Sequence, residues 1–201
     1  MKIAISGLSG CGNTTACKNV SKALGLKIVN YTFRDLAKEM NLTLDQLQLK
    51  SKSDPYYDYL VDQHLIDFAT KKKRFVMGSR LAGWLVQDAD LRVWLSAPFQ
   101  ERAKRIAARE GIPLEKALVH TKKRDEENHE RYKRYYGVDV DDLGGFGLVL
   151  DTSKLSAEQV CAAIVQAAKK AKESGEKKHG KLALAIGEKV VFELEKRKKQ
   201  V

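Results

Sequence analysis

Short apolar segments alternate with longer amphipathic segments along most of the chain. Apolar runs at residues 3–5, 26–29, 74–77, 91–95 and 148–150 predict strands, and stretches with helical spacing separate them. Strands that alternate with helices need right-handed crossovers, which produce a parallel sheet covered by helices on both faces. The pattern therefore predicts a three-layer α/β domain. The main helices are expected over residues 14–24, 98–111, 113–136 and 156–172.

Two segments depart from this alternation. Residues 33–70 are polar and helical in pattern with a break at Pro55, which predicts a small helical insertion. Ser174–Gly180 is typical of a linker, so we divide the chain into a domain over residues 1–174 and an extension over residues 175–201. Beyond the linker we predict a hairpin that turns at Gly187-Glu188, with a helix as a nearly equal alternative. The hairpin rests on two alternating sets, Leu182, Leu184 and Ile186, then Val190, Phe192 and Leu194.

Charge is unevenly distributed over the 201 residues. The net charge is +11, and residues 169–201 hold 11 Lys and Arg against 5 Asp and Glu. Clustered positive charge favours an anionic partner, either a nucleotide or RNA. The sequence has neither a membrane-spanning apolar stretch nor a signal-peptide pattern, so we expect a cytoplasmic protein without a membrane partner. We interpret Cys11, Cys17 and Cys161 as reduced thiols, because their spacing is not that of a zinc site.

A glycine-rich loop joins the first predicted strand to the first predicted helix. It fits the phosphate-loop pattern GxxxxGK[ST] except that Asn13 replaces the lysine. Its glycines allow backbone N–H groups to converge on phosphate oxygens, and the Thr14 hydroxyl is placed to bind Mg²⁺. A purely structural strand-to-helix turn is the alternative. The candidate nucleotide-binding residues are Gly7, Leu8, Ser9, Gly10, Cys11, Gly12, Asn13, Thr14 and Thr15.

Further motifs follow the loop. They are Phe33-Arg34-Asp35-Leu36-Ala37-Lys38-Glu39-Met40, Asp54-Pro55 with Asp58 and Asp62, Gly78-Ser79-Arg80-Leu81-Ala82-Gly83-Trp84, Ala89-Asp90-Leu91-Arg92-Val93-Trp94-Leu95 with Ala97-Pro98, Arg131-Tyr132, and Tyr136-Gly137-Val138-Asp139-Val140-Asp141-Asp142-Leu143. With them, residues 1–168 resemble the archaeal-type cytidylate kinases, a family of nucleoside monophosphate kinases with the phosphate-loop fold.

The resemblance implies transfer of the γ-phosphoryl group of ATP, with Mg²⁺, to the phosphate of CMP or dCMP. It makes residues 33–70 the monophosphate-binding insertion and residues 113–143 the lid. Arg34 and Arg80 would hold the acceptor phosphate, and Asp62 would accept a hydrogen bond from the cytosine amino group. These two arginines, with Arg124 and Arg131 of the lid, are the expected catalytic residues.

The lid arginines have a second interpretation. Arg124, Arg131 and Arg134 lie seven and three residues apart, which places them on one helical face where they could neutralise charge during transfer. On a solvated helix the same arginines would instead pair with their acidic neighbours. Those neighbours are Asp125, Glu126, Glu127 and Glu130.

The chain departs from the family pattern at several positions. Besides Asn13, Gly78 stands where the family has an acidic residue. Gln63 and His64 replace two arginines, and Phe146 and Gly147 replace a tyrosine and an aspartate. Two other functions therefore stay open: a catalytically silent nucleotide-binding switch, and an RNA- or ribosome-associated protein that binds through residues 177–201. The assembly is expected to be a monomer or a homodimer, and we assign Trp84 and Trp94 to the core.

Overall fold

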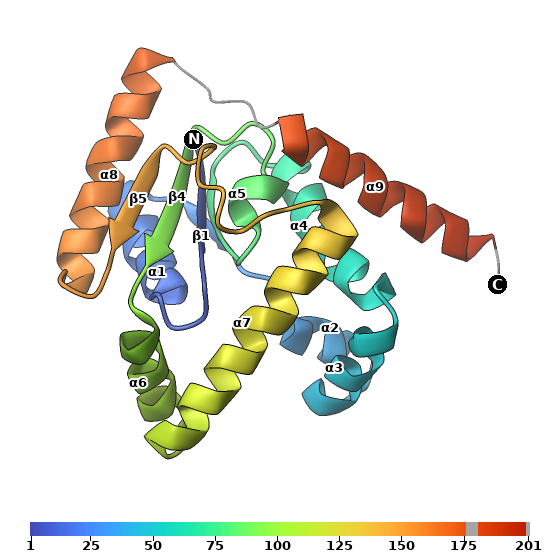
Figure 1. The fold of residues 1–201 in the computed structure, drawn as a ribbon. Helices are drawn as coiled ribbons and strands as arrows, with labels where there is room; N and C mark the ends of the chain where they lie inside the picture. Colours follow the sequence, from blue (N-terminus) through green and yellow to red (C-terminus); the bar gives the residue numbers. More distant parts are fainter. Residues whose placement is uncertain (176–180, 200–201) are drawn as a thin grey trace.

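The chain is described here by a computed structural model that covers residues 1–175 and 181–199 (Figure 1). Its centre is a parallel sheet of five strands in the order β2-β3-β1-β4-β5. In the central strand, Ile5 lies beside Gly78 on one side and Val93 on the other. The predicted α/β class is thus confirmed. The strands are β1 (Lys2–Gly7), β2 (Lys27–Val29), β3 (Phe75–Gly78), β4 (Leu91–Ser96) and β5 (Leu148–Asp151).

Successive side chains of the buried strand β1 enter two separate apolar cores, as the pleat of a strand requires. Ile3 and Ile5 face α1 (Asn13–Leu24) and α8 (Ala157–Ser174), whereas Ala4 faces the core on the opposite side of the sheet. Helices α1 and α8 therefore form one outer layer (Figure 1).

The second core contains the aromatic residues of the domain. Trp84 of α5 (Ala82–Leu85), Trp94 of β4 and Phe146 pack edge to face, with ring centroids 4.9–5.8 Å apart. All three side chains are buried. The prediction that both tryptophans belong to the core is confirmed, while α5 was not predicted because it is only one turn long.

The insertion between β2 and β3 is helical, as predicted. It contains α2 (Phe33–Glu39), α3 (Leu44–Ser53) and α4 (Tyr56–Lys71). Capping boxes start the first two helices: Thr32 pairs with Asp35, and Thr43 pairs with Gln46. These caps satisfy backbone N–H groups that would otherwise lack partners, so they fix where the short helices begin.

Helices α6 (Phe99–Glu110) and α7 (Leu114–Tyr136) follow β4. Gly111 and Gly137 end them with φ angles of 65° and 67°, a left-handed conformation that glycine adopts without strain. The long helix α7 runs from α6 towards α4, past the edge of the insertion (Figure 1).

The predicted terminal hairpin is wrong, because residues Lys181–Lys198 form one helix, α9. Ile186, Val190 and Leu194 are buried in the second core, and α9 packs against α4 and α5. Residues four apart lie on one face of a helix, and they also lie on one face of a strand because their spacing is even. The spacing alone therefore did not distinguish the helix from the hairpin. Residues 176–180 of the predicted linker, and the side chains of Leu182 and Leu184, lie outside the described residues.

Helix α9 is also held at its far end. Arg197 forms an ion pair of 2.6 Å with Asp54, and its guanidinium lies 4.5 Å from the centre of the Tyr56 ring. Both partners flank the start of α4, so α9 joins the insertion to the rest of the domain. Across the described ranges, no helix has the length and apolar character needed to cross a membrane.

Candidate active site

The glycine-rich loop leaves the carboxyl end of β1 and enters α1. Gly10 and Gly12 adopt φ angles of 88° and 95°, a region that strains other residues. A Cβ on Gly10 would also lie 2.7 Å from the backbone oxygen of Arg102. The two glycines therefore allow a tight turn at a helix N-terminus, which is the geometry that binds phosphate.

Asn13, at the position of the usual lysine, points back into the base of this loop. Its Nδ2 donates a 2.7 Å hydrogen bond to the backbone oxygen of Gly7. Its Oδ1 is buried, with no hydrogen-bond partner among the described residues. The side chain thus fastens the two ends of the loop together, whereas a lysine would have projected a charge.

Three arginines from other elements surround the loop. Arg80, which follows β3, donates from Nη2 to Oγ of Ser9 at 2.9 Å. Arg102 and Arg105 of α6 donate from Nη1 to the backbone oxygens of Ser9 and Gly10, each at 3.2 Å. Sequence reasoning missed the two arginines on α6. They lie three residues apart in the helix predicted after Pro98, a spacing that places both on one helical face.

A second cluster lies between the insertion and α7. Asp58 and Asp62 are buried on α4, and Arg131 of α7 reaches Asp58 with 3.5 Å between Nη1 and Oδ1. Tyr136 donates a hydrogen bond to Oδ2 of Asp62. The remaining oxygen of Asp58 and Nε of Arg131 are buried without a partner in the described chain. This arrangement leaves one acceptor and one donor available to a ligand.

Burial changes the protonation of both carboxyl groups. It raises the pKa of Asp58 to about 6, although the charges of Arg131 and Arg80 oppose the shift. It raises the pKa of Asp62 to about 7, where the hydrogen bond from Tyr136 opposes and the charge of Asp58 adds to the rise. Two carboxyl groups with pKa values near neutrality mark this cluster as a functional-site candidate.

Asn128 connects the two clusters. Its Oδ1 accepts from Nη1 of Arg80 at 3.2 Å and from Nη2 of Arg131 at 2.6 Å. Arg124 lies one turn earlier on α7, and its pKa is lowered by burial and by the positive charge of Arg80. A continuous set of contacts therefore runs from Ser9 in the loop to Asp58 in the insertion. Sequence reasoning did not select Asn128, since nothing in its local context distinguishes it.

The other predicted residues fall in different places. Arg34 is exposed on α2, and no described side chain holds its guanidinium by a hydrogen bond or ion pair. Arg134 is also exposed, with its guanidinium 5.9 Å from the centre of the Tyr135 ring. Asp125 forms an ion pair of 2.7 Å with Arg102 on α6. Asp125 therefore pairs with α6, although its charge also favours the charged form of Arg124.

The side chain of Cys17 leaves no room for an acidic side chain at Gly78. A Cβ on Gly78 would lie 2.5 Å from Sγ of Cys17, which occupies the space that a longer side chain needs. Thr14, at the start of α1, lines the same small pocket as these two residues. The expected binding of Mg²⁺ by the Thr14 hydroxyl stays a prediction.

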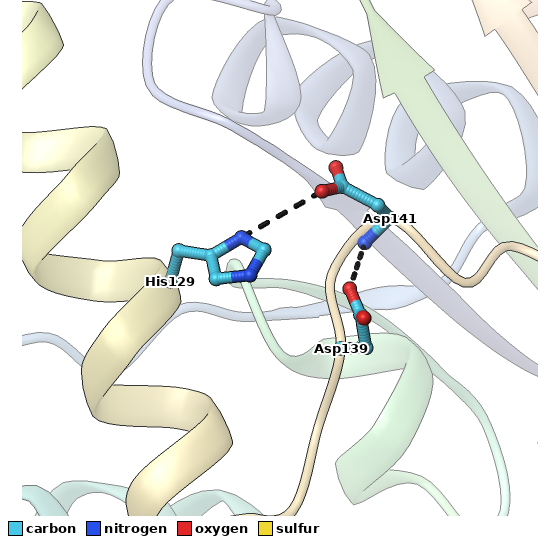
Figure 2. A group of neighbouring side chains, drawn as sticks. All are labelled: His129, Asp139 and Asp141. Carbon is cyan, nitrogen blue, oxygen red and sulfur yellow. Dashed lines mark hydrogen bonds and ion pairs between the residues drawn. The ribbon is translucent and has the colours of Figure 1, made fainter.

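A separate group of polar side chains lies near the end of α7 (Figure 2). Nδ1 of His129 lies 3.7 Å from Oδ2 of Asp141, and the backbone N–H of Asp141 donates to Asp139. Asp141 is 84% exposed. These contacts hold the segment after α7 against the helix.

A phosphate loop at the central strand, faced by arginines from the following elements, makes this domain a phosphate-loop kinase. Solved structures of the same fold agree. An uncharacterized protein from Eubacterium ventriosum superposes with a TM-score of 0.64 at 18% identity, over 84% of this chain and 98% of that one. A shikimate kinase from Acinetobacter baumannii gives 0.54 at 17% identity, over 82% and 90%.

Sequence comparison identifies the family. Residues 2–154 match the cytidylate kinase-like family, and this chain belongs to it. The cytidylate kinase of Pyrococcus abyssi is 44% identical over 168 residues, which cover 83% of this chain and 92% of that protein. That of Thermococcus kodakarensis is 42% identical, over 83% and 86%. The chain is accordingly a nucleoside monophosphate kinase, and α9 lies beyond the residues that define the family.

Proposed function

We propose that the protein transfers the γ-phosphoryl group of ATP to the phosphate of CMP or dCMP. The observation that carries the proposal is the row of contacts from Ser9 through Arg80, Asn128 and Arg131 to Asp58. It connects a loop suited to the donor phosphates with an insertion suited to the acceptor. The names of the relatives support cytidine as the acceptor nucleoside.

The acceptor would bind between α2, α4 and Arg80. No described side chain engages the guanidinium of Arg34, and its fork matches the oxygens of a phosphate. Asp62 would accept a hydrogen bond from the cytosine amino group, and Tyr136 holds its carboxylate in place. Uracil offers a carbonyl oxygen there instead of an amino group, so the ionised form of Asp62 would reject it.

Transfer then needs alignment and charge neutralisation, without a covalent intermediate on the protein. An oxygen of the CMP phosphate forms a bond to the γ-phosphorus as the bond between that phosphorus and the β,γ-bridging oxygen breaks, and ADP leaves with the electron pair. Arg124 and Arg131 of α7 would neutralise the charge on the transferring group. Mg²⁺ bound with the nucleotide would supply further neutralisation, held on the protein side by the Thr14 hydroxyl.

The test is an ADP-release assay with CMP, dCMP, UMP and AMP as acceptors. We expect turnover with CMP or dCMP and at least tenfold lower kcat/KM with UMP. Binding of ATP and CMP without turnover would establish the silent nucleotide-binding switch instead. We do not propose the RNA-associated alternative, because α9 uses its apolar face and Arg197 to pack on the domain.

A further inference from the structure

The phosphate loop of this chain lacks the cation that normally holds the outer phosphates of the nucleotide. Asn13 does not replace it, because its amide is neutral and its Nδ2 is committed to the backbone oxygen of Gly7. A site that binds a triphosphate without this charge loses a charge-assisted hydrogen bond, which is stronger than a neutral one. Another cation near the loop would restore it.

Arg80 occupies the position that such a cation needs. It leaves the carboxyl end of β3, next to the central strand that carries the loop. Nη2 donates to Oγ of Ser9 inside the loop, and Nη1 donates to Oδ1 of Asn128. Both partners are neutral, and within the described ranges Arg80 takes part in no ion pair. Although its charge also acts on Asp58, no carboxylate in the described ranges holds the guanidinium in an ion pair, so it can bind an anion.

Three other arginines near the site already have partners. Arg102 forms an ion pair of 2.7 Å with Asp125. Arg105 donates to the backbone oxygen of Gly10 and to both oxygens of Thr152, so its guanidinium connects the loop to the segment after β5. Arg131 reaches Asp58 in the insertion.

Like charges also meet at this point. Arg80 lies close enough to Arg124 to contribute to lowering the pKa of that arginine. Two neighbouring cations repel one another, and a bound anion between them removes the repulsion. The electrostatics and the hydrogen bonds thus agree that the space beside Arg80 is suited to a phosphate.

We propose that Arg80 replaces the missing loop lysine and binds the outer phosphates of ATP, in addition to the acceptor phosphate. This inference rests on the proposed kinase function and adds a role on the donor side. A guanidinium has two edges, so it can contact a donor phosphate and an acceptor phosphate together, which a lysine ammonium does less well. To bind phosphate, Arg80 gives up only its hydrogen bonds to the Ser9 hydroxyl and the Asn128 amide, so the cost is small.

The experiment is a double-mutant cycle on nucleotide binding, measured by calorimetry without an acceptor. The four proteins are the wild type, Arg80→Gln, Asn13→Lys and the double variant, each titrated with Mg²⁺-ATP and with AMP. We expect Arg80→Gln to weaken ATP binding at least tenfold and AMP binding less than threefold, because AMP has no outer phosphates. Asn13→Lys should restore ATP binding in the Arg80→Gln background and change it little in the wild type.

Controls separate folding from binding. Arg74→Gln is the matched variant, because Arg74 is exposed and precedes β3, the strand that Arg80 follows. It should bind ATP as the wild type does. Circular dichroism and the melting temperature of each variant show whether it is folded, and Arg80→Lys supplies a second test that keeps the charge. If Arg80→Gln proves unfolded, Arg80→Lys decides: weakened ATP binding supports the inference, and unchanged ATP binding overturns it.

Failure of this inference differs from failure of the proposed function. Unchanged ATP affinity in folded Arg80→Gln, or equal gains from Asn13→Lys in both backgrounds, would overturn the role of Arg80 while CMP phosphorylation continues. A wild type that binds CMP and ATP but shows no turnover would overturn the proposed activity alone. A wild type that does not bind ATP would overturn both.

Discussion

Replacing Ile186 by alanine is expected to lower the free energy of unfolding by about 2–5 kcal/mol. Ile186 lies on α9 and is 1% exposed, within the core that also contains residues of α4 and α5. The variant removes three buried carbons and leaves a cavity that rigid neighbours fill only in part. For a chain of this length, each kcal/mol lowers the melting temperature by about 2–4 °C, so a decrease of about 4–20 °C is expected.

The matched control is Phe192→Ala on the same helix. Phe192 is 62% exposed, so its removal should change the free energy of unfolding by no more than about 0.5 kcal/mol. Urea denaturation of both variants, followed by circular dichroism, provides the comparison. Equal and small effects would show that α9 is a detachable extension and that the packing described here is wrong.

The same packing predicts the effect of removing α9. A chain that ends at residue 174 would expose the apolar surface that Ile186, Val190 and Leu194 cover. It should unfold at a lower temperature and lose CMP phosphorylation in parallel, because α4 carries Asp58 and Asp62. Full activity at the wild-type melting temperature would contradict this expectation.

Three further predictions concern the site. The pKa of Asp62 is raised to about 7 in the folded chain, so the wild type should lose stability relative to Asp62→Asn as the pH rises from about 4 to 7. Above pH 7 the difference should level off. Urea denaturation between pH 4 and 8 measures it, and a difference that is constant with pH would contradict the burial effect. Arg34→Ala should lower kcat/KM for CMP, which corresponds to a rise of about 2–4 kcal/mol in activation free energy, without changing the melting temperature. The exposed Lys38→Ala on the same helix should change neither quantity. Equal kcat/KM in the two variants would show that Arg34 is not part of the site. Gly78→Asp should destabilise by about 1–3 kcal/mol in thermal unfolding. Added Cys17→Ala removes Sγ and should recover part of the loss, measured against Cys17→Ala alone; no recovery would show that Sγ is not the obstacle.

Sequence pattern alone determined the elements whose period is unambiguous. The apolar runs predicted all five strands. The three inner strands, β1, β3 and β4, are buried along most of their length and are therefore apolar on both faces, while the edge strands β2 and β5 are partly exposed. Gly111 marked a helix end for a local reason, because it adopts a left-handed conformation that glycine takes without strain. The phosphate loop was likewise visible, because its function needs glycines at close spacing in one segment.

Tertiary structure decided what depends on distant partners. Residues 181–198 have apolar positions that fit either period, and only the surface of α4 and α5 selects the helix that buries Ile186, Val190 and Leu194. The site shows the same limit. Asp58 and Asn128 gained their roles from arginines far along the chain, because a side chain's free hydrogen-bonding capacity depends on which neighbours the fold brings within reach.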